Sequence, residues 1–389
     1  MQLRNTANNA HINLFSLAGA PAFPLDGTIN SINIGKGANS VSTNTVLGVT
    51  ALDAAVTGNS NTAIGYQTLT TNTSASNNTA IGYNSLALTT TGGNNTAVGS
   101  GALDANTTAV GNCAFGLSSL TANTTGVRNN AFGVSTLQTN TEGEYNCAFG
   151  YGTLASNTTA DYNSGFGHNA LLANTTGTSN VAVGAFALDA NTTGVSNVAV
   201  GNNALGANTT ANNNTAIGRE SLLVNTTGAN NSALGAFALD ANTTGNNNVA
   251  IGQGALGSNT TASDNVAVGQ GALNDNTTGT ANTAIGHIAL GENTTANDNT
   301  AVGFSALNAN TTGSQQVAVG VGALQKTTTG SFNVAVGFEA LDENTTGERN
   351  TAIGLVALRQ NTTGSHNVAI GNVALDANTT ASNNTAIGS

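Results

Sequence analysis

NTAIGLVALRQNTTGSH, residues 350–366, is one copy of the 17-residue unit that decides the fold of this chain. We number the unit from its first Asn, so that Asn350 is at repeat position 1 and His366 at position 17. The glycine at position 5 recurs every 17 residues from Gly48 to Gly388, 21 times, without an insertion or a deletion. A strict period of this kind is typical of a repeat protein.

The unit is too short for the paired helices of a helical solenoid. Its fixed glycine and its β-branched residues favour strand and turn. We therefore predict an all-β fold, a parallel β-solenoid of about 21 coils, in which each strand pairs with its copy in the next coil about 4.8 Å away. An extra residue within a strand would exchange its two faces, which explains why the period is kept strictly.

Two apolar columns are expected to form the core. Position 4 is apolar in all 21 units, and position 9 is Leu in all 20 complete units. Phe fills position 4 in four consecutive units, where position 2 changes as well. The Phe residues are Phe115, Phe132, Phe149 and Phe166, and the residues at position 2 are Cys113, Asn130, Cys147 and Ser164. Because a close-packed interior requires compensation of volume, we interpret both positions as parts of one core.

Asn and Ala columns complete the pattern. Asn occupies position 1 in 20 of 21 units, which predicts a stacked amide ladder at a turn. Ala80 at position 3 neighbours Ile81, so the two side chains point to opposite faces of a strand. A strand that is apolar on both faces suggests a second packed surface, and another copy of the chain is the simplest partner. We expect a parallel homotrimer, with a single-chain solenoid as the alternative.

The motif resembles that of known fibre proteins. Units such as Asn61-Thr-Ala-Ile-Gly65 and Asn350-Thr-Ala-Ile-Gly354 are similar to the repeats of phage tail-fibre-type proteins and, more distantly, to the Ala-Ile-Gly head repeats of trimeric autotransporter adhesins. The resemblance covers residues 44–389 and implies a trimeric β-solenoid fibre used for attachment. The chain departs from the adhesins in repeat length, and it shows no signal peptide, heptad stalk or membrane-anchor barrel.

Composition narrows the class of function. Charged residues make up 6% of the chain, and its seven Lys and Arg form no basic stripe, so we expect no nucleic acid partner. No stretch approaches the roughly 18 apolar residues of a membrane span, so we expect no membrane insertion. The four His residues are scattered over the chain, and no spacing suggests a catalytic triad. We expect no enzyme activity, cofactor or metal.

Two weaker patterns concern a disulfide and a calcium site. Cys113 and Cys147 share a repeat position two coils apart, about 9.6 Å by the strand spacing, which exceeds the reach of a disulfide. The run Asp189-Ala-Asn191-Thr-Thr193 places oxygen atoms at alternate positions, as in half of a calcium loop, but the distal Glu is absent. Neither pattern predicts a site.

The Asn-Thr-Thr/Ser run at positions 12 to 14 matches the acceptor of N-glycosylation in sixteen units. Val56 replaces the middle Thr in the first unit, which suggests that this Thr faces inward and that the flanking Asn and Thr face outward. The alternatives are a turn with local hydrogen bonds, a glycosylated fibre, and a flat Thr ladder that orders water as in ice-binding solenoids. The glycosylation candidates are Asn72, Asn106, Asn123, Asn157, Asn174, Asn191, Asn208, Asn225, Asn242, Asn259, Asn276, Asn293, Asn310, Asn344, Asn361 and Asn378.

Two segments follow from the period. Residues 1–43 lie outside it and are expected to form a cap or an assembly segment, and residues 44–389 form the shaft. The last unit stops in mid-coil, which leaves two alternatives: the sequence is a piece of a longer fibre, or residues 1–43 of one subunit close the open coil of the next and build a filament.

The sequence therefore predicts a structural fibre, extracellular or on a virion surface. The alternative is a binding module, either an adhesin that binds glycans or an ice-binding protein. Tyr66, Tyr83 and Tyr151 are the candidates for an adhesin's aromatic patch, although they are equally compatible with ordinary exposed strand positions.

Overall fold

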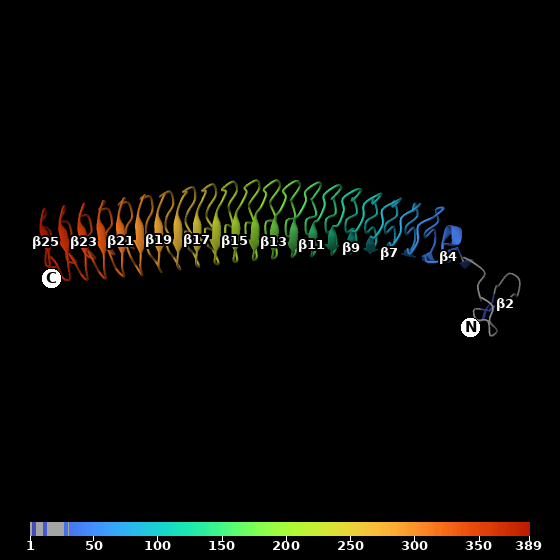
Figure 1. The fold of residues 1–389 in the computed structure, drawn as a ribbon, viewed down its shortest axis with the longest axis horizontal. Helices are drawn as coiled ribbons and strands as arrows, with labels where there is room; N and C mark the ends of the chain where they lie inside the picture. Colours follow the sequence, from blue (N-terminus) through green and yellow to red (C-terminus); the bar gives the residue numbers. More distant parts are fainter. Residues whose placement is uncertain (1, 5–10, 14–26, 30) are drawn as a thin grey trace. The chain divides into compact units, whose positions relative to one another are not determined.

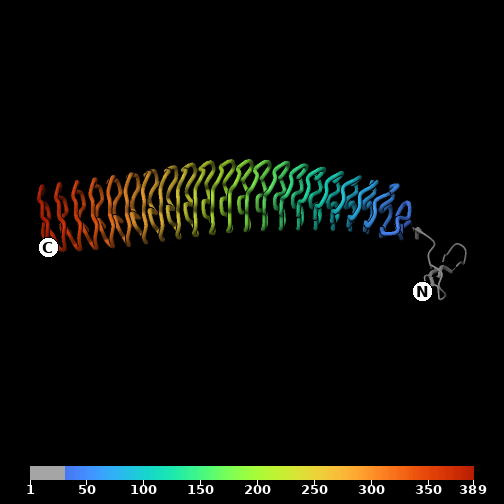
Figure 2. The backbone as a smooth tube through the Cα atoms, viewed as in Figure 1, coloured from blue at the N-terminus to red at the C-terminus, as the bar shows by residue number. Residues whose placement is uncertain are grey.

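The computed structural model describes residues 2–4, 11–13, 27–29 and 31–389, which divide into two units, Met1–Asn163 and Ser164–Ser389. Each unit is a parallel β-solenoid with one short strand per 17-residue coil, and its coils stack one on the next (Figures 1 and 2). The predicted fold class is confirmed.

The strands of the coils occupy repeat positions 2 to 4. In the first unit they are β5 (Thr45–Gly48), β6 (Thr62–Ile64), β7 (Thr79–Ile81), β8 (Thr96–Val98), β9 (Cys113–Phe115), β10 (Asn130–Phe132) and β11 (Cys147–Phe149). In the second they are β12 (Ser164–Phe166), β13 (Val181–Val183), β14 (Val198–Val200), β15 (Thr215–Ile217), β16 (Ser232–Leu234), β17 (Val249–Ile251), β18 (Val266–Val268), β19 (Thr283–Ile285), β20 (Thr300–Val302), β21 (Val317–Val319), β22 (Val334–Val336), β23 (Thr351–Ile353), β24 (Val368–Ile370) and β25 (Thr385–Ile387).

Neighbouring strands pair in parallel at an offset of one repeat. In β17 and β18, for example, Val249 lies opposite Val266 and Ile251 opposite Val268. Hydrogen bonds between coils continue outside the strands: the N–H of Leu222 donates to the carbonyl of Ala238 at 3.0 Å. Most of the coil therefore lies outside regular strands, and its backbone N–H and C=O groups still form hydrogen bonds with the adjacent coil.

Three residues per coil, most of them not glycine, bend the chain. Positions 7, 9 and 17 adopt left-handed backbone conformations, and the Leu residues at position 9 have φ between 46° and 57°. Glycine is required at position 5 for a steric reason. A Cβ on Gly218, whose φ is 139°, would lie 2.4 Å from the carbonyl oxygen of Gly235 in the next coil. Only glycine permits coils to stack this closely.

The interior is narrow and contains six columns of side chains. Leu at position 9 is fully buried, as predicted, and so are Ala at position 3 and the small residue at position 8. Asn at positions 1 and 12 and Ala or Gly at position 15 complete it. The prediction that position 4 belongs to the core is wrong, because Ile217, Ile251 and Ile353 are 38 to 39% exposed.

The Asn columns replace part of an apolar core with hydrogen bonds. The backbone N–H of Asn231 donates to Oδ1 of Asn214 at 2.9 Å, which confirms the amide ladder at position 1. The carbonyl of Gly228 accepts from Nδ2 of Asn214 and of Asn225, each at 2.9 Å. Buried amides of this kind are tolerated only when they are bonded, as here.

An antiparallel segment precedes the first coil. β3 (Gly27–Ile29) pairs with β4 (Ile32–Gly35), and β4 pairs with β5, both antiparallel. The short 3₁₀ helix η1 (Ala38–Ser40) follows, and the N–H of Ala38 donates to the carbonyl of Leu52. β4 and η1 thus contact their own first coil. The remaining described part of residues 1–43 includes the antiparallel pair β1 (Gln2–Arg4) and β2 (His11–Asn13); residues 1, 5–10, 14–26 and 30 lie outside the described chain.

Candidate functional site

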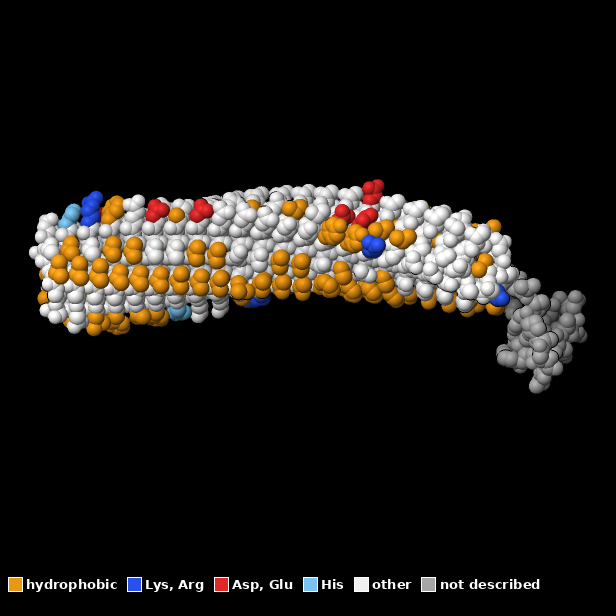
Figure 3. Space-filling view, viewed as in Figure 1, with side chains coloured by type: hydrophobic (Ala, Val, Ile, Leu, Met, Phe, Trp, Pro, Cys, Tyr) orange, Lys and Arg blue, Asp and Glu red, His pale blue; other side chains and the backbone are white. Residues whose placement is uncertain are grey.

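One regular surface feature of each unit is the outer face of the strands, formed by repeat positions 2 and 4, which we call the apolar face. Position 4 holds Ile, Val, Leu or Phe in every coil, and position 2 holds mostly Thr or Val. Ile251 is 39% exposed and Leu234 is 47% exposed, whereas Ala250, which directly precedes Ile251 at position 3, is fully buried. Hydrophobic side chains form rows along the surface (Figure 3). Contiguous apolar rows of this kind mark interaction surfaces.

The Phe ladder belongs to this face and not to the core. The rings of Phe115 and Phe132 stack at 4.9 Å, and those of Phe132 and Phe149 at 4.5 Å. Phe149 is 37% exposed, and Phe166 in the second unit is 40% exposed. The prediction that positions 2 and 4 share a face is right, because they are two residues apart in a strand. Its assignment to the interior is wrong.

The Ala column likewise has another role than the one expected. Ala250 and Ala267 lie opposite each other on β17 and β18 and are fully buried within the coil. Their small size is required by the narrow cross-section. The prediction that the Ala column forms a contact between chains is therefore wrong.

The Asn-Thr-Thr run forms a corner of the coil with the Asn inside. Asn225 is fully buried, Thr226 is half-buried and donates its hydroxyl to the carbonyl of Thr243 at 3.0 Å, and Thr227 is exposed. The expectation that the Asn faces outward is wrong. It depended on the first unit, where Val56 is buried and Ala55 is exposed, the reverse of the other coils.

Burial of this Asn bears on all sixteen glycosylation candidates. Every one except Asn378, which is half-buried, is fully buried in its coil. The Nδ2 atom that would carry a glycan instead donates inside the solenoid, as from Asn191 to Oδ1 of Asn174 at 2.8 Å. A bulky glycan requires a surface position, so the folded coil does not offer these nitrogens for modification.

The exposed tyrosines of the strand edge form one close pair. Tyr66 and Tyr83 stack at 5.6 Å and are 46% and 54% exposed. Tyr151 is also exposed at the same repeat position, but four coils after Tyr83. The predicted set is therefore not one patch.

A second aromatic cluster was missed by the sequence analysis. Arg128, Tyr145 and Tyr162 follow one another at repeat position 17, where most units carry Asn, Ser or Asp. The guanidinium carbon of Arg128 lies 5.4 Å from the ring centre of Tyr145, and the rings of Tyr145 and Tyr162 are 5.2 Å apart. Three successive departures from the column were the signal that could have identified it.

Metal and thiol chemistry find little support in the described chain. No group of three or more His, Cys, Asp or Glu residues that could hold a metal occurs among those residues. Oδ1 of Asn191, in the calcium-like run, accepts from Nδ2 of Asn208 at 2.9 Å within the solenoid. Cys113 and Cys147 are free thiols, as expected, and burial raises the pKa of both.

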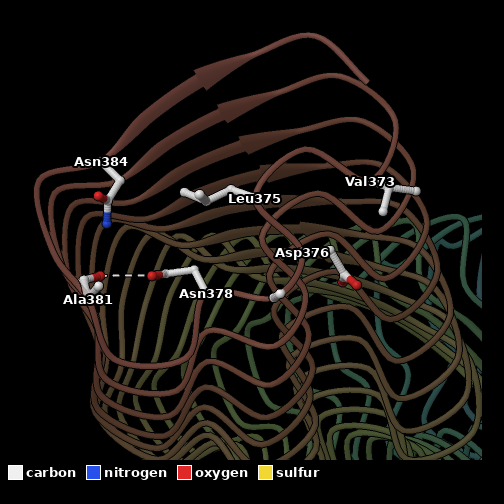
Figure 4. A pocket seen from close by; sticks show the side chains of 7 residues that line it. Val373, Leu375, Asp376, Asn378, Ala381 and Asn384 are labelled. Atoms are coloured by element: carbon white, nitrogen blue, oxygen red, sulfur yellow. Dashed lines mark hydrogen bonds between the residues drawn. The ribbon is translucent and has the colours of Figure 1, made fainter.

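The hollow in Figure 4 is a cross-section of the interior. Its lining includes Leu375, Asn378, Ala381 and Asn384, which occupy the repeat positions buried by the following coil elsewhere. Nδ2 of Asn378 donates to the carbonyl of Ala381 at 3.0 Å, as in the other coils. Asp376 also lines it, and its carboxylate pairs with Arg359 at 3.5 Å; apart from this ion pair the hollow has the chemistry of the packed core.

Comparison with known proteins adds no assignment. No protein-family model matches this sequence, and no curated protein matches it significantly. Within the described residues, the structure contains no helix long and apolar enough to cross a membrane.

Proposed function

We propose that this chain is the shaft of a non-catalytic structural fibre, extracellular or on a virion surface, in which copies of the chain associate side by side through the apolar face. The observation that carries the proposal is the apolar side chain at position 4, which is exposed or half-buried on the outer face of every coil. Ile251 is 39% exposed, Val268 in the next coil is half-buried, and Ile285 in the coil after that is 41% exposed. A solvated strand face has no reason to keep Ile, Val, Leu or Phe in every coil.

A second copy of the chain is the partner that fits this face. The apolar side chains recur once per coil, about 4.8 Å apart, and only a partner with the same axial repeat offers one apolar side chain for each of them. Mutual packing of position 4 with positions 2 and 4 of a parallel copy would bury the rows together. We expect three copies, as the resemblance in the Asn-Thr-Ala-Ile-Gly motif implies.

The size of the face supports a stable association. The strands of the second unit, β12 to β25, cover about 60 Å along the solenoid axis, and three residues span about 10 Å across it. The resulting area of about 600 Å² per copy approaches the roughly 800 Å² per partner of a standard interface. Few charges would be desolvated, because positions 2 and 4 carry none in the second unit.

Sedimentation of matched variants tests this proposal. Ile251→Lys with Ile285→Lys places charges on the apolar face, whereas Thr244→Lys with Thr278→Lys places them on the exposed corner and serves as the control. We expect the parent and the control to sediment as one oligomer and the first variant as a folded monomer, because Lys cannot be desolvated in a close interface. A monomeric parent, or dissociation in both variants, would contradict association through this face.

End-to-end assembly through residues 1–43 stays a prediction. β4 and η1 contact their own first coil, so closure of another subunit's coil would require them to leave it or other residues of the segment 1–43 to act instead. Electron microscopy of the purified protein distinguishes rods of finite length from continuous filaments.

Ice binding is a second candidate, favoured by the Thr corner. In the second unit, position 14 is Thr in 13 consecutive coils, from Thr176 to Thr380, and all of these side chains are exposed. A row of identical hydroxyl and methyl groups at strand spacing could order water. Thermal hysteresis in the parent, lost in Thr244→Lys with Thr278→Lys, is the expected result for this function; absence of hysteresis in the parent would rule it out.

A further inference from the structure

Repeat position 17 is an exposed column with two irregular segments. Its residues adopt the left-handed conformation throughout, and most are Asn, Ser or Asp. Arg128, Tyr145 and Tyr162 interrupt this pattern in the first unit, and all three side chains are exposed. Phe332 and Arg349 do so in the second, where the guanidinium carbon lies 5.1 Å from the ring centre. The first segment contains a pair of stacked rings, and we call Arg128, Tyr145 and Tyr162 the tyrosine cluster.

The members of the tyrosine cluster contact one another on the surface. Nη1 of Arg128 donates to the hydroxyl of Tyr145. The rings of Tyr145 and Tyr162 lie 5.2 Å apart and within 8° of parallel. Tyr145 is 37% exposed and lies between the Arg128 guanidinium and the Tyr162 ring, and Tyr162 is 60% exposed, so the ring edges and the outer face of Tyr162 face solvent.

Core stability does not explain these residues. A bulky side chain with φ of 57° or 60°, as at Tyr145 and Tyr162, costs roughly 1–2 kcal/mol of backbone energy that Asn or Gly largely avoids. Stacking of two exposed rings returns about 0.5–1.5 kcal/mol for the pair. The column folds with Asn or Ser in other coils, so the Tyr residues add little or nothing to stability. Strained and exposed side chains of this kind point to function.

Carboxylates lie next to the tyrosines in the sequence. Glu144 and Asp161 directly precede Tyr145 and Tyr162 at position 16, and the N–H of Glu144 donates to Oδ1 of Asp161 at 2.7 Å. Glu142 lies in the same turn. With three carboxylates and the single guanidinium of Arg128, the segment carries a formal charge of −2, since +1 and −3 are summed over residues 128 to 162. Figure 3 shows acidic, basic and hydrophobic side chains gathered together on this face.

We propose that the tyrosine cluster binds a neutral or amino-bearing oligosaccharide. Aromatic rings pack against the apolar C–H faces of sugar rings, and carboxylate and guanidinium groups bond their hydroxyls in the planar, paired geometry that vicinal hydroxyls require. The face of the Tyr162 ring that points away from Tyr145 can pack against one sugar of such a chain. The negative charge disfavours acidic glycans and nucleic acids, because like charges repel.

Replacement by the column's own residues provides the test. Tyr145→Asn with Tyr162→Ser restores the usual residues of position 17 and should leave folding unchanged. Tyr66→Asn with Tyr83→Asn removes the other stacked, exposed pair and is the matched control. Binding of the full chain to immobilised chito-oligosaccharides, malto-oligosaccharides and sialylated oligosaccharides is measured for all three proteins, and equal melting temperatures establish that each is folded.

We expect the parent to bind a neutral or amino-bearing probe and the cluster variant to bind it roughly tenfold or more weakly, since two stacking rings are lost. The control should bind like the parent, and sialylated probes should bind weakly to all three. No binding to any probe by the parent, equal losses in both variants, or a preference for sialylated probes would each overturn the proposal. Oligosaccharide binding should persist in Ile251→Lys with Ile285→Lys, because the tyrosine cluster at position 17 is separate from the apolar face at positions 2 and 4.

Discussion

The inner and outer faces of the same strands differ in a way that hydrophobicity alone does not predict. Ala250 is fully buried, whereas Ile251, one residue later and far more apolar, is 39% exposed. The whole second unit repeats this arrangement, with small residues inside and large apolar residues outside. In a coil of 17 residues the interior is so narrow that the size of a side chain, more than its polarity, decides which face it takes.

The polar interior supports the same conclusion. Asn214 and Asn225 are both fully buried, and their amides converge on the carbonyl of Gly228. One Leu per coil is the only large aliphatic side chain that the cross-section holds. The coil is therefore held together by close stacking and hydrogen-bonded columns as much as by apolar burial.

Arginine substitutions on the two faces of β17 should differ most in their effect on the unfolding free energy. Ala250→Arg would place an unpaired charge and a long side chain in the packed interior, at a cost of about 4–8 kcal/mol. Ile251→Arg, on the outer face of the same strand, should change the unfolding free energy of the monomer by less than about 0.5 kcal/mol. Chemical denaturation of both variants in dilute solution measures the difference, and similar midpoints would contradict the assignment of the faces.

The next largest effect on stability should distinguish two adjacent leucines. Leu222 is fully buried at position 9, whereas Leu223 is half-buried at position 10. Leu222→Ala should lower the unfolding free energy by about 2–5 kcal/mol, because a cavity opens in the only large apolar column. Leu223→Ala is the control and should cost clearly less. Hydrogen exchange of the neighbouring coils should report the loss locally, since each coil contacts only the next; equal protection in both variants would count against the column.

The period, the fold class, the Leu column and the ladder of Asn at position 1 could all be predicted from the sequence, because each depends on one residue type kept at one position. The face of the strand could not. The alternation along Thr215-Ala-Ile217 indicates which residues share a face of the strand, but it does not indicate which face is inside. We assigned the larger apolar residue, Ile217, to the interior, and this assignment is wrong.

The orientation of Asn at position 12 was mispredicted for a related reason. The inference rested on Val56 in the first coil, whose Ala55 lacks the amide that bonds inside the other coils. The tyrosine cluster was missed because position 17 was treated as variable. Its left-handed backbone, which makes Tyr unusual there, is not visible without the structure.

A smaller effect distinguishes the inner Asn from the outer Thr of the same corner. Asn225→Ala would leave the carbonyl of Gly228 without one donor and Oδ1 of Asn208 without its partner, and should cost about 1–3 kcal/mol. Thr227→Ala, two residues later and exposed, should be nearly neutral. Thermal unfolding of the two variants compares them. An equal or larger loss in Thr227→Ala would place the Asn outside and restore the glycosylation hypothesis.

The smallest expected effect concerns a carboxylate at the boundary between the two environments. Burial, with a further contribution from the charge of Glu220, raises the pKa of Asp240 in the folded coil. The folded state then holds its proton more tightly than the unfolded chain does. Stability contributed by the protonated form is present below the ordinary aspartate value of about 4 and is lost as the pH rises through the raised pKa. Asn is accepted at the same repeat position in Asn274 and Asn308.

Asp240→Asn should therefore be slightly more stable than the parent at pH 7, by up to about 0.5 kcal/mol, because a half-buried side chain is strongly screened. The difference should vanish in acid, where the parent carboxyl is protonated and resembles the amide. Asn308→Ala, at the same repeat position but without a carboxylate, is the control, and its difference from the parent should not approach zero in acid. Denaturation midpoints measured from pH 3 to pH 7 decide the question. A variant whose advantage grows in acid would show that the carboxylate, and not the acid, is the form that the folded coil favours.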